Sequence, residues 1–196
     1  MATVLEEVRE DHLARYRFAV EQLKQHNDVQ HVLDAGCGIG YGSSMLSEHF
    51  QRITSVEISE EAHATYQAHW QRPNIDYHCV SLLEFTPATL PDAVVCFEFI
   101  EHVSFYREIL ARFASWSPRL IISTPNEKVR PHLQEPVNPF HFRHFTPEEL
   151  EAELELVGYR VETWHCQLNG AKPKVLPGTD GKFIIAVATQ TGDRGC

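Results

Sequence analysis

A glycine-rich turn between two expected regular elements is the most informative chemical feature of the sequence. The apolar run His31–Ala35 predicts a buried strand, and glycines then alternate at positions 36, 38, 40 and 42, beside a helix expected over Tyr41–His49. Glycine has no Cβ, so such a turn lets a ligand lie against bare backbone, and the helix presents free N–H groups at its N-terminus. This order of elements predicts a cradle for a nucleotide-type cofactor at the carboxyl end of a parallel strand.

Two acidic residues beside the turn indicate which kind of cofactor it takes. A dinucleotide fingerprint has the spacing G-x-G-x-x-G, whereas the glycines here alternate, and Asp34 stands where it would face an anionic pyrophosphate. The second expected strand, Arg52–Glu57, ends in a carboxylate that is placed to accept hydrogen bonds from both hydroxyls of a ribose. The pattern therefore disfavours a nicotinamide oxidoreductase.

Asp34, the alternating glycines and Glu57 together resemble the class I S-adenosylmethionine-dependent methyltransferases, whose first motif is E/D-x-G-x-G-x-G. The resemblance implies S-adenosylmethionine as cofactor and an α/β, Rossmann-like, doubly wound sheet of seven strands, mostly parallel with the last strand antiparallel, and with helices on both faces. It implies that the residues that bind the cofactor are Tyr16, Asp34, Gly36, Cys37, Gly38, Gly40, Glu57, Ile58, Ser81, Leu82 and Phe97. Ser81 is a departure, since the family usually has an acidic residue there and a hydroxyl supplies no charge.

A second group of chemically suited residues follows the expected strand Ala93–Glu98. Glu98, Glu101 and His102 form an E-x-x-E-H element, and His141 comes later, just before the next expected helix. The element resembles that of ubiquinone-biosynthesis and glycan-associated small-molecule O-methyltransferases, and that of small-RNA 3′-terminal 2′-O-methyltransferases, which hold a divalent metal there. The resemblance implies Glu98, Glu101, His102 and His141 as ligands of Mg²⁺, Mn²⁺ or Zn²⁺.

The alternative is that these residues act without a metal ion. Glu101 falls at a helix start, where the helix dipole stabilises a carboxylate whatever its function. Transfer of a methyl group to an alcohol or phenol requires removal of a proton, and histidine can accept a proton near neutral pH. His102, His141 and His144 are therefore the candidate general bases.

The segment Pro125–Phe145 predicts a substrate-facing loop. Four prolines make a helix or a central strand improbable, and a loop of this length in a compact domain usually has a function. Three histidines and two arginines lie within it, namely Arg130, His132, His141, Arg143 and His144. The alternative is a flexible surface excursion without a function.

The remaining hydrophobic periodicities predict alternating helices and strands, which are typical of a parallel sheet. Helices are expected over Leu5–Gln25, Ser59–His69, residues 100–115 and Thr146–Val157; further strands are expected over Ile75–Val80, Leu120–Ser123, Tyr159–Cys166 and Lys182–Thr189, the last two as a hairpin with a long connection. Residues 1–196 are expected to form a single methyltransferase domain, with an N-terminal helical segment over 1–28 and the substrate loop over 125–145.

Composition limits the choice of partner and compartment. A net charge of −10 argues against a nucleic-acid partner, because nucleic-acid binders carry a basic face. No apolar run is long enough to span a bilayer, no signal peptide is visible, and the five cysteines lack the spacing of a zinc site or a disulfide framework. A cytoplasmic enzyme is therefore expected.

Together the motifs predict a methyltransferase that acts on a hydroxyl group of a small molecule or glycan. One alternative is a metal-dependent RNA 3′-terminal 2′-O-methyltransferase. Another is a non-catalytic module that binds S-adenosylmethionine for regulation, against which the intact glycines and Glu57 argue, since an inactive site has no need of them.

Overall fold

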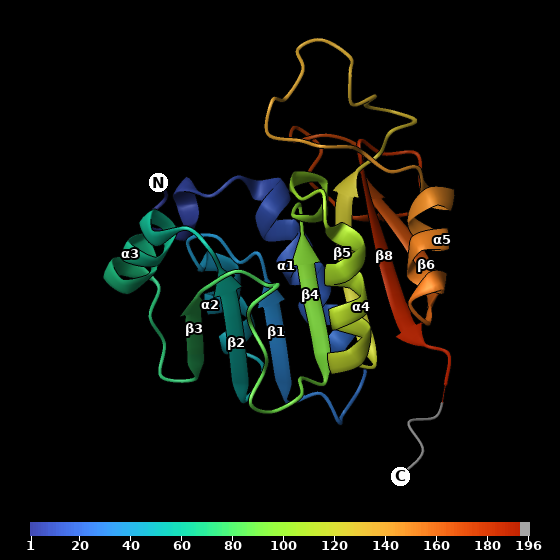
Figure 1. The fold of residues 1–196 in the computed structure, drawn as a ribbon. Coiled ribbons are helices and arrows are strands. Elements are labelled where there is room, and N and C mark those ends of the chain that lie inside the picture. The colour runs from blue at the N-terminus through green and yellow to red at the C-terminus, as the bar shows by residue number, and fades with distance from the viewer. Residues whose placement is uncertain (193–196) are drawn as a thin grey trace.

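The computed structural model describes residues 1–192, and its centre is an eight-stranded sheet (Figure 1). The strand order is β3-β2-β1-β4-β5-β8-β6-β7, with β1 to β5 parallel to one another. The strands are β1 (His31–Ala35), β2 (Arg52–Glu57), β3 (Ile75–Cys79), β4 (Ala93–Phe97), β5 (Arg119–Pro125), β6 (Tyr159–Gln167), β7 (Leu176–Pro177) and β8 (Phe183–Gln190). The last strand, β8, is antiparallel to both of its neighbours, which confirms that part of the expectation.

The expected number of seven strands is wrong by one short element. β7 consists of Leu176 and Pro177, which pair with Cys166 and His165 at the end of β6. Two residues cannot show an alternating pattern, and proline is tolerated because β7 lies at the edge of the sheet. The expected hairpin of β6 and β8 is confirmed, with β7 inside its long connection.

Two expected helices are each divided in two. The helices are η1 (Leu5–Glu7), α1 (Glu10–Leu23), α2 (Tyr41–Ser47), α3 (Glu60–His69), η2 (Ile100–His102), α4 (Tyr106–Trp116) and α5 (Pro147–Leu156), where η marks a 3₁₀ helix. Extended backbone at Val8 ends the first 3₁₀ turn, and extended backbone at Val103 ends the second. η1 buries no side chain, so it lacks the packing that extends a helix. The expected continuous helices over 5–25 and 100–115 are therefore wrong.

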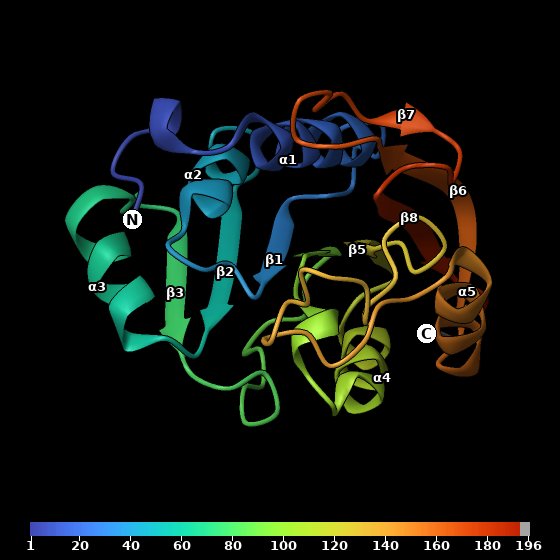
Figure 2. The same cartoon turned by 90° about the horizontal axis from the view of Figure 1, so that it is seen from above.

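Both faces of the sheet are covered, as Figure 2 shows, with α1 and α2 on one side and α4 and α5 on the other. Successive side chains of a strand point to opposite faces. Val32 and Val95 accordingly belong to the core beneath α1 and α2, whereas Leu33 and Val94 belong to the core beneath α4 and α5. Strands buried on both sides explain the unbroken apolar runs of β1 and β4.

The strand order reverses at β1: the chain adds β2 and β3 on one side of it, and β4 and β5 on the other. Such a point leaves a crevice beyond the carboxyl ends of the strands, where ligands bind in this type of sheet. Residues 126–145 form no helix or strand and pass beyond this edge of the sheet (Figure 1). The topology thus brings the glycine-rich turn, the E-x-x-E-H element and the expected loop to one edge.

Among residues 1–192, no helix has the length and apolar character needed to cross a bilayer. The cysteines in this part of the chain are all free thiols. Cys196 lies outside the described residues.

Candidate cofactor and acceptor site

Glu57 closes the glycine-rich turn against the end of β2. Its carboxylate accepts a hydrogen bond from the backbone N–H of Gly38 (3.2 Å) and two more from those of Ile58 (2.9 Å) and Ser59 (3.0 Å). These bonds fix the carboxylate beside the turn. A carboxylate has about four lone-pair positions, so it retains capacity for a ribose hydroxyl.

Two glycines of the turn are required for different reasons. Gly38 has a φ of +53°, and a Cβ placed on it would meet no atom within 4 Å, so this stretch of backbone faces open space. Gly42 is packed instead: a Cβ there would lie 1.9 Å from the ring of Tyr16. Gly38 is therefore the position at which a ligand can lie against backbone, and Gly42 lets α1 and α2 approach each other.

Asp34 is fully buried beneath α1 and α2. Its carboxylate accepts hydrogen bonds from the hydroxyls of Tyr16 (3.0 Å) and Ser43 (2.7 Å), and Ser43 accepts one from Ser55 (2.8 Å). Burial raises the pKa of Asp34 to about 6, although the two hydroxyls oppose the shift. The expected cofactor residues Tyr16 and Asp34 thus form a buried pair that holds the two helices to β1.

Five of the expected cofactor residues, namely Gly36, Glu57, Ile58, Ser81 and Leu82, line an apolar cavity at the ends of β1, β2 and β3. Its lining is Gly36, Val56, Glu57, Ile58, Val80, Ser81, Leu82, Phe99, Val103 and Phe105. The hydroxyl of Ser81 accepts the N–H of Leu83 (3.2 Å). The cavity is small, with a volume of about 60 Å³, and its apolar walls with Glu57 at the rim are of the kind that contact a purine ring and its ribose.

The remaining expected residues, Cys37, Gly38, Gly40 and Phe97, lie outside that cavity, as do Tyr16 and Asp34. Cys37 is buried, and burial raises the pKa of its thiol well above the ordinary value. Gly40 adopts a left-handed conformation and caps the N-terminus of α2. Phe97 is buried and packs edge-to-face on Tyr16.

A polar cluster follows the end of β4. Glu101, His102 and His141 each offer one ligand atom within 4.8 Å of the others. Glu101 is completely buried, and neither of its carboxylate oxygens has a hydrogen-bond partner. Burial, and the nearby charge of Glu98, raise the pKa of the Glu101 carboxyl well above its usual range. The cluster is therefore a place where a ligand would satisfy buried polar atoms.

Hydrogen bonds to backbone fix which nitrogen of each histidine is free. His102 Nδ1 lies 2.9 Å from the carbonyl oxygen of Phe140, and a carbonyl only accepts, so Nδ1 carries the proton and Nε2 keeps its lone pair. His144 Nδ1 likewise donates to the carbonyl of Arg130 (2.6 Å). The neutral His144 ring then accepts at Nε2 from Nδ1 of His141 (2.6 Å). The pair leaves Nε2 of His141 free.

The pKa values agree with neutral rings in this pair. Burial lowers the pKa of His141 to about 4, and the neighbouring histidines and Arg130 add to this shift. Burial also lowers the pKa of His144. His144 is buried behind His141, so of the three expected bases only His102 and His141 have a free Nε2 in the cluster.

Glu98 is the expected ligand that the structure does not bring into the cluster. It has a left-handed backbone conformation, with a φ of 50°, which is strained for a residue with a side chain. Its carboxylate accepts the hydroxyl of Ser123 on β5 (3.0 Å), and burial raises its pKa while the charge of Arg15 opposes that shift. Three of the four expected ligands are together, and Glu98 acts on Glu101 through its charge.

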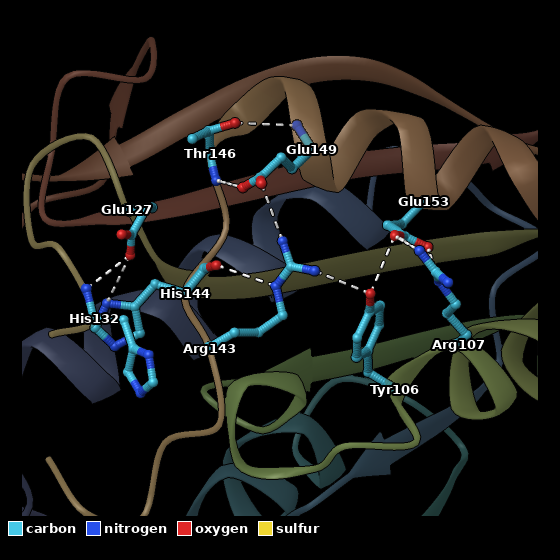
Figure 3. A network of polar contacts seen from close by, with 9 residues as sticks. All are labelled: Tyr106, Arg107, Glu127, His132, Arg143, His144, Thr146, Glu149 and Glu153. Atoms are coloured by element: carbon cyan, nitrogen blue, oxygen red, sulfur yellow. Dashed lines mark hydrogen bonds and ion pairs between the residues drawn. The ribbon is translucent and has the colours of Figure 1, made fainter.

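The end of the loop is clamped to α4 and α5 (Figure 3). Arg143 donates to the hydroxyl of Tyr106 (3.1 Å) and pairs with Glu149 (3.2 Å), which also closes the capping box of α5 with Thr146. Earlier in the loop, the N–H of Phe142 donates to the carbonyl of Glu101 (2.7 Å). These contacts place His141 beside the 3₁₀ turn η2.

Two residues of the site were not among those predicted from the sequence. Arg15 is buried in α1, donates to Gln167 (2.5 Å), and its charge acts on Glu98 and Glu101. Phe99 lines the apolar cavity, and its ring fills the space beside Gly36 that a Cβ would need. Arg15 falls on the buried face of an amphipathic helix, which is the one signal that marks it as unusual.

The sheet order, the glycine-rich turn after β1 and the acidic residue after β2 define a Rossmann-like methyltransferase fold. The family described as methyltransferase domain matches residues 6–163. The chain belongs to this family and is a S-adenosylmethionine-dependent methyltransferase.

Named relatives are consistent with this family. A probable S-adenosylmethionine-dependent methyltransferase of Mycolicibacterium smegmatis is 29% identical over 90% of the chain and 70% of the relative. A ubiquinone biosynthesis O-methyltransferase of Coxiella burnetii is 33% identical over 53% of the chain, which spans about half (47%) of that relative. The N-methyltransferase NodS of Bradyrhizobium japonicum, solved with S-adenosyl-L-homocysteine, has the same fold, with a TM-score of 0.73 at 15% identity over 95% of the chain and 90% of NodS.

Proposed function

We propose that the chain transfers the methyl group of S-adenosylmethionine to a hydroxyl of a small, ring-bearing molecule such as a sugar or a phenol. The observation that carries this proposal is the pair of imidazole nitrogens, Nε2 of His102 and of His141, that make no hydrogen bond and lie next to the buried Glu101 at the end of β4. A hydroxyl acceptor needs a proton acceptor at the point of attack. The similarity to a ubiquinone biosynthesis O-methyltransferase supports an oxygen acceptor.

The residues of the glycine-rich turn fit the cofactor. Gly38 leaves backbone open to a ligand, Glu57 retains lone pairs for the ribose, and the small cavity beside Phe99 supplies an apolar contact surface for the adenine. The bound sulfonium supplies an already activated methyl group. The contribution of the chain is then to orient the acceptor and to exclude water, since positioning accounts for much of such a rate enhancement.

In the proposed mechanism the acceptor hydroxyl lies against the histidine pair. Nε2 of His102 or His141 takes the hydroxyl proton as the oxygen attacks the methyl group. The carbonyl of Phe140 holds the tautomer of His102, and His144 holds that of His141. The aromatic side chains of Phe140 and Phe142 are 74% and 62% exposed on the loop. They are available to cover the face of a ring-bearing acceptor.

A metal-assisted form of the same reaction is the second candidate. Glu101 has two buried oxygens without partners, and each histidine presents a lone pair, so the donor set suits Mg²⁺, Mn²⁺ or Zn²⁺. Three protein ligands leave coordination positions open, as in catalytic metal sites. These residues would hold the ion, which would lower the pKa of the acceptor hydroxyl.

The experiment is an acceptor screen that follows release of S-adenosylhomocysteine, with and without chelator. Turnover of hydroxyl-bearing sugars or phenols, lost in His102→Ala, supports the proposal. Transfer only to amines would contradict the oxygen acceptor. Loss of turnover with chelator and its return with one of the three ions would establish the metal-assisted form, and unchanged turnover would leave the histidines as bases.

A further inference from the structure

A second cavity opens between the loop, the start of α1 and the β6–β7 connection. It has a volume of about 520 Å³, within the range of small-molecule sites. Its lining residues are Arg9, Val129, Arg130, Gln134, Glu135, Pro136, Asn169, Gly170, Lys182 and Phe183. None of them belongs to the expected cofactor site.

The charge of this cavity is opposite to that of the protein. The chain carries 17 basic and 27 acidic residues, yet the cavity is lined by three cations, Arg9, Arg130 and Lys182, and by one carboxylate, Glu135. Glu135 accepts the backbone N–H of Val137 (3.3 Å), which partly occupies it. With Asp11, the partner of Arg9, also counted, the cavity keeps a net positive charge, which attracts anions.

Two of the three cations have no partner for their charged groups. Within residues 1–192, the side chains of Arg130 and Lys182 make no hydrogen bond or ion pair, although the Arg130 charge acts on nearby titratable groups. Arg9 differs, because its guanidinium pairs with Asp11 (2.6 Å). Arg130 and Lys182 are therefore the cations available to a ligand.

The topology places this cavity next to the histidine cluster. β8 is antiparallel to β5, so Lys182, just before β8, lies at the edge where the parallel strands end. Arg130 belongs to both places: its side chain lines the cavity, while its carbonyl accepts Nδ1 of His144, which holds His141. An acceptor that spans the two would have its anionic group at Arg130 and its hydroxyl at His141.

We propose that this cavity binds a carboxylate or phosphate group of the methyl acceptor, so that the substrate is an anionic hydroxy compound. The inference rests on the proposed function, because it assigns the acceptor of that reaction. Arg130 supplies a planar fork for the anion and Lys182 a second charge. A carboxylate and a phosphate would make the same kind of charge-assisted hydrogen bonds with these two cations, and the experiments below distinguish between the two groups.

The first experiment measures anion binding without turnover. Inorganic phosphate and acetate are titrated separately at constant ionic strength, with chloride as the reference, and followed by NMR at the backbone amides of Arg130, Gly170 and Phe183. Saturable shifts with one or both anions are expected, and the stronger anion identifies the group. Lys182→Gln combined with Arg130→Gln should abolish them, whereas Lys24→Gln, an exposed lysine at the far end of α1, should not. Shifts that do not saturate, or that persist in the double variant, overturn the proposal.

The second experiment compares matched acceptors: glucuronate with glucose, and glucose 6-phosphate with glucose. The anionic member of a pair should be the better acceptor, and Lys182→Gln should raise its KM about tenfold or more with a smaller change in kcat, since a charge-assisted hydrogen bond contributes ~1.5–3 kcal/mol. Equal use of both members overturns the inference. Calorimetry of S-adenosylmethionine on the same variants separates the outcomes, because loss of cofactor binding would concern the proposed function and not the anion cavity.

Discussion

The two halves of the site differ in how far their polar groups are satisfied within the chain. In the cofactor half, Asp34 is paired with Tyr16 and Ser43, and Glu57 with three backbone N–H groups. In the acceptor half, Glu101 is buried without a partner. The first half is complete as folded, whereas the second holds unsatisfied groups that a ligand would complete. Under the proposed function, the cofactor site is formed before the cofactor binds, whereas the cluster around Glu101 is completed by its ligand.

The largest effect is expected from breaking the acceptor half. His141→Ala removes a free Nε2 from the cluster and should lower kcat by ~10²–10⁴-fold, the usual contribution of a general acid–base group. Affinity for S-adenosylmethionine, measured by calorimetry, should stay unchanged, because His141 does not line the apolar cavity. His69→Ala, an exposed histidine at the end of α3, is the matched control. A parallel fall in cofactor affinity would show that the two halves are not separate.

The geometry of the glycine-rich turn is predictable from the sequence because its signals are local. Glycine spacing, an apolar run and the acidic residue that ends β2 lie within one stretch of chain, and the turn around Gly38 follows from them. The role of Gly42 was not predictable, since it depends on the ring of Tyr16 from another helix.

The acceptor half is less predictable because distant segments build it. The E-x-x-E-H spacing suggests that Glu98 joins Glu101. In the structure, the Glu98 carboxylate instead accepts a hydrogen bond from the hydroxyl of Ser123 on β5. The bond between His141 and His144 depends on the carbonyl of Arg130, fourteen positions before His144. No local pattern encodes such contacts, and the same holds for the break at Val103.

A second prediction tests the burial of Asp34 in the cofactor half. Its folded pKa of about 6 lies above the ordinary value of 3.8, so the folded state binds the proton more tightly. The stabilisation is complete below pH ~4 and is lost as pH rises through ~6. Two pKa units correspond to ~3 kcal/mol of unfolding free energy.

Chemical denaturation of the wild type and of Asp34→Asn at pH 4 and pH 7 measures this difference. The wild type should lose up to ~3 kcal/mol more than the variant over that range. Asp180→Asn, at an exposed aspartate, should follow the wild type. Identical pH dependence of wild type and Asp34→Asn would mean that Asp34 titrates normally.

A third prediction weakens the cofactor half without unfolding it. Glu57→Ala should reduce affinity for S-adenosylmethionine by roughly 10–100-fold, since a hydrogen bond to a charged group contributes ~1.5–3 kcal/mol. Part of the loss comes from the turn, because Gly38 loses its acceptor. Glu57→Gln, which keeps the shape and an acceptor oxygen, should retain more of the affinity. Unchanged affinity in Glu57→Ala would remove the ribose assignment.

The smallest effect is expected in the loop that connects the two halves. Residues 126–145 lack regular structure, and their ties to η2 are the hydrogen bonds from Phe142 to Glu101 and from His102 to Phe140. Hydrogen exchange of this segment should be faster than that of β1 and β4, because its backbone hydrogen bonds lie in turns at the surface and not in a buried strand ladder. Cofactor alone should change it little, since the cofactor cavity contains no residue of the loop. Cofactor with an anionic hydroxy acceptor such as glucuronate should slow exchange around Phe140 and Phe142 a few-fold, because closure over the acceptor would shield these amides. Slower exchange of the loop with cofactor alone would show that the loop responds to the cofactor. The loop would then belong to the cofactor half of the site.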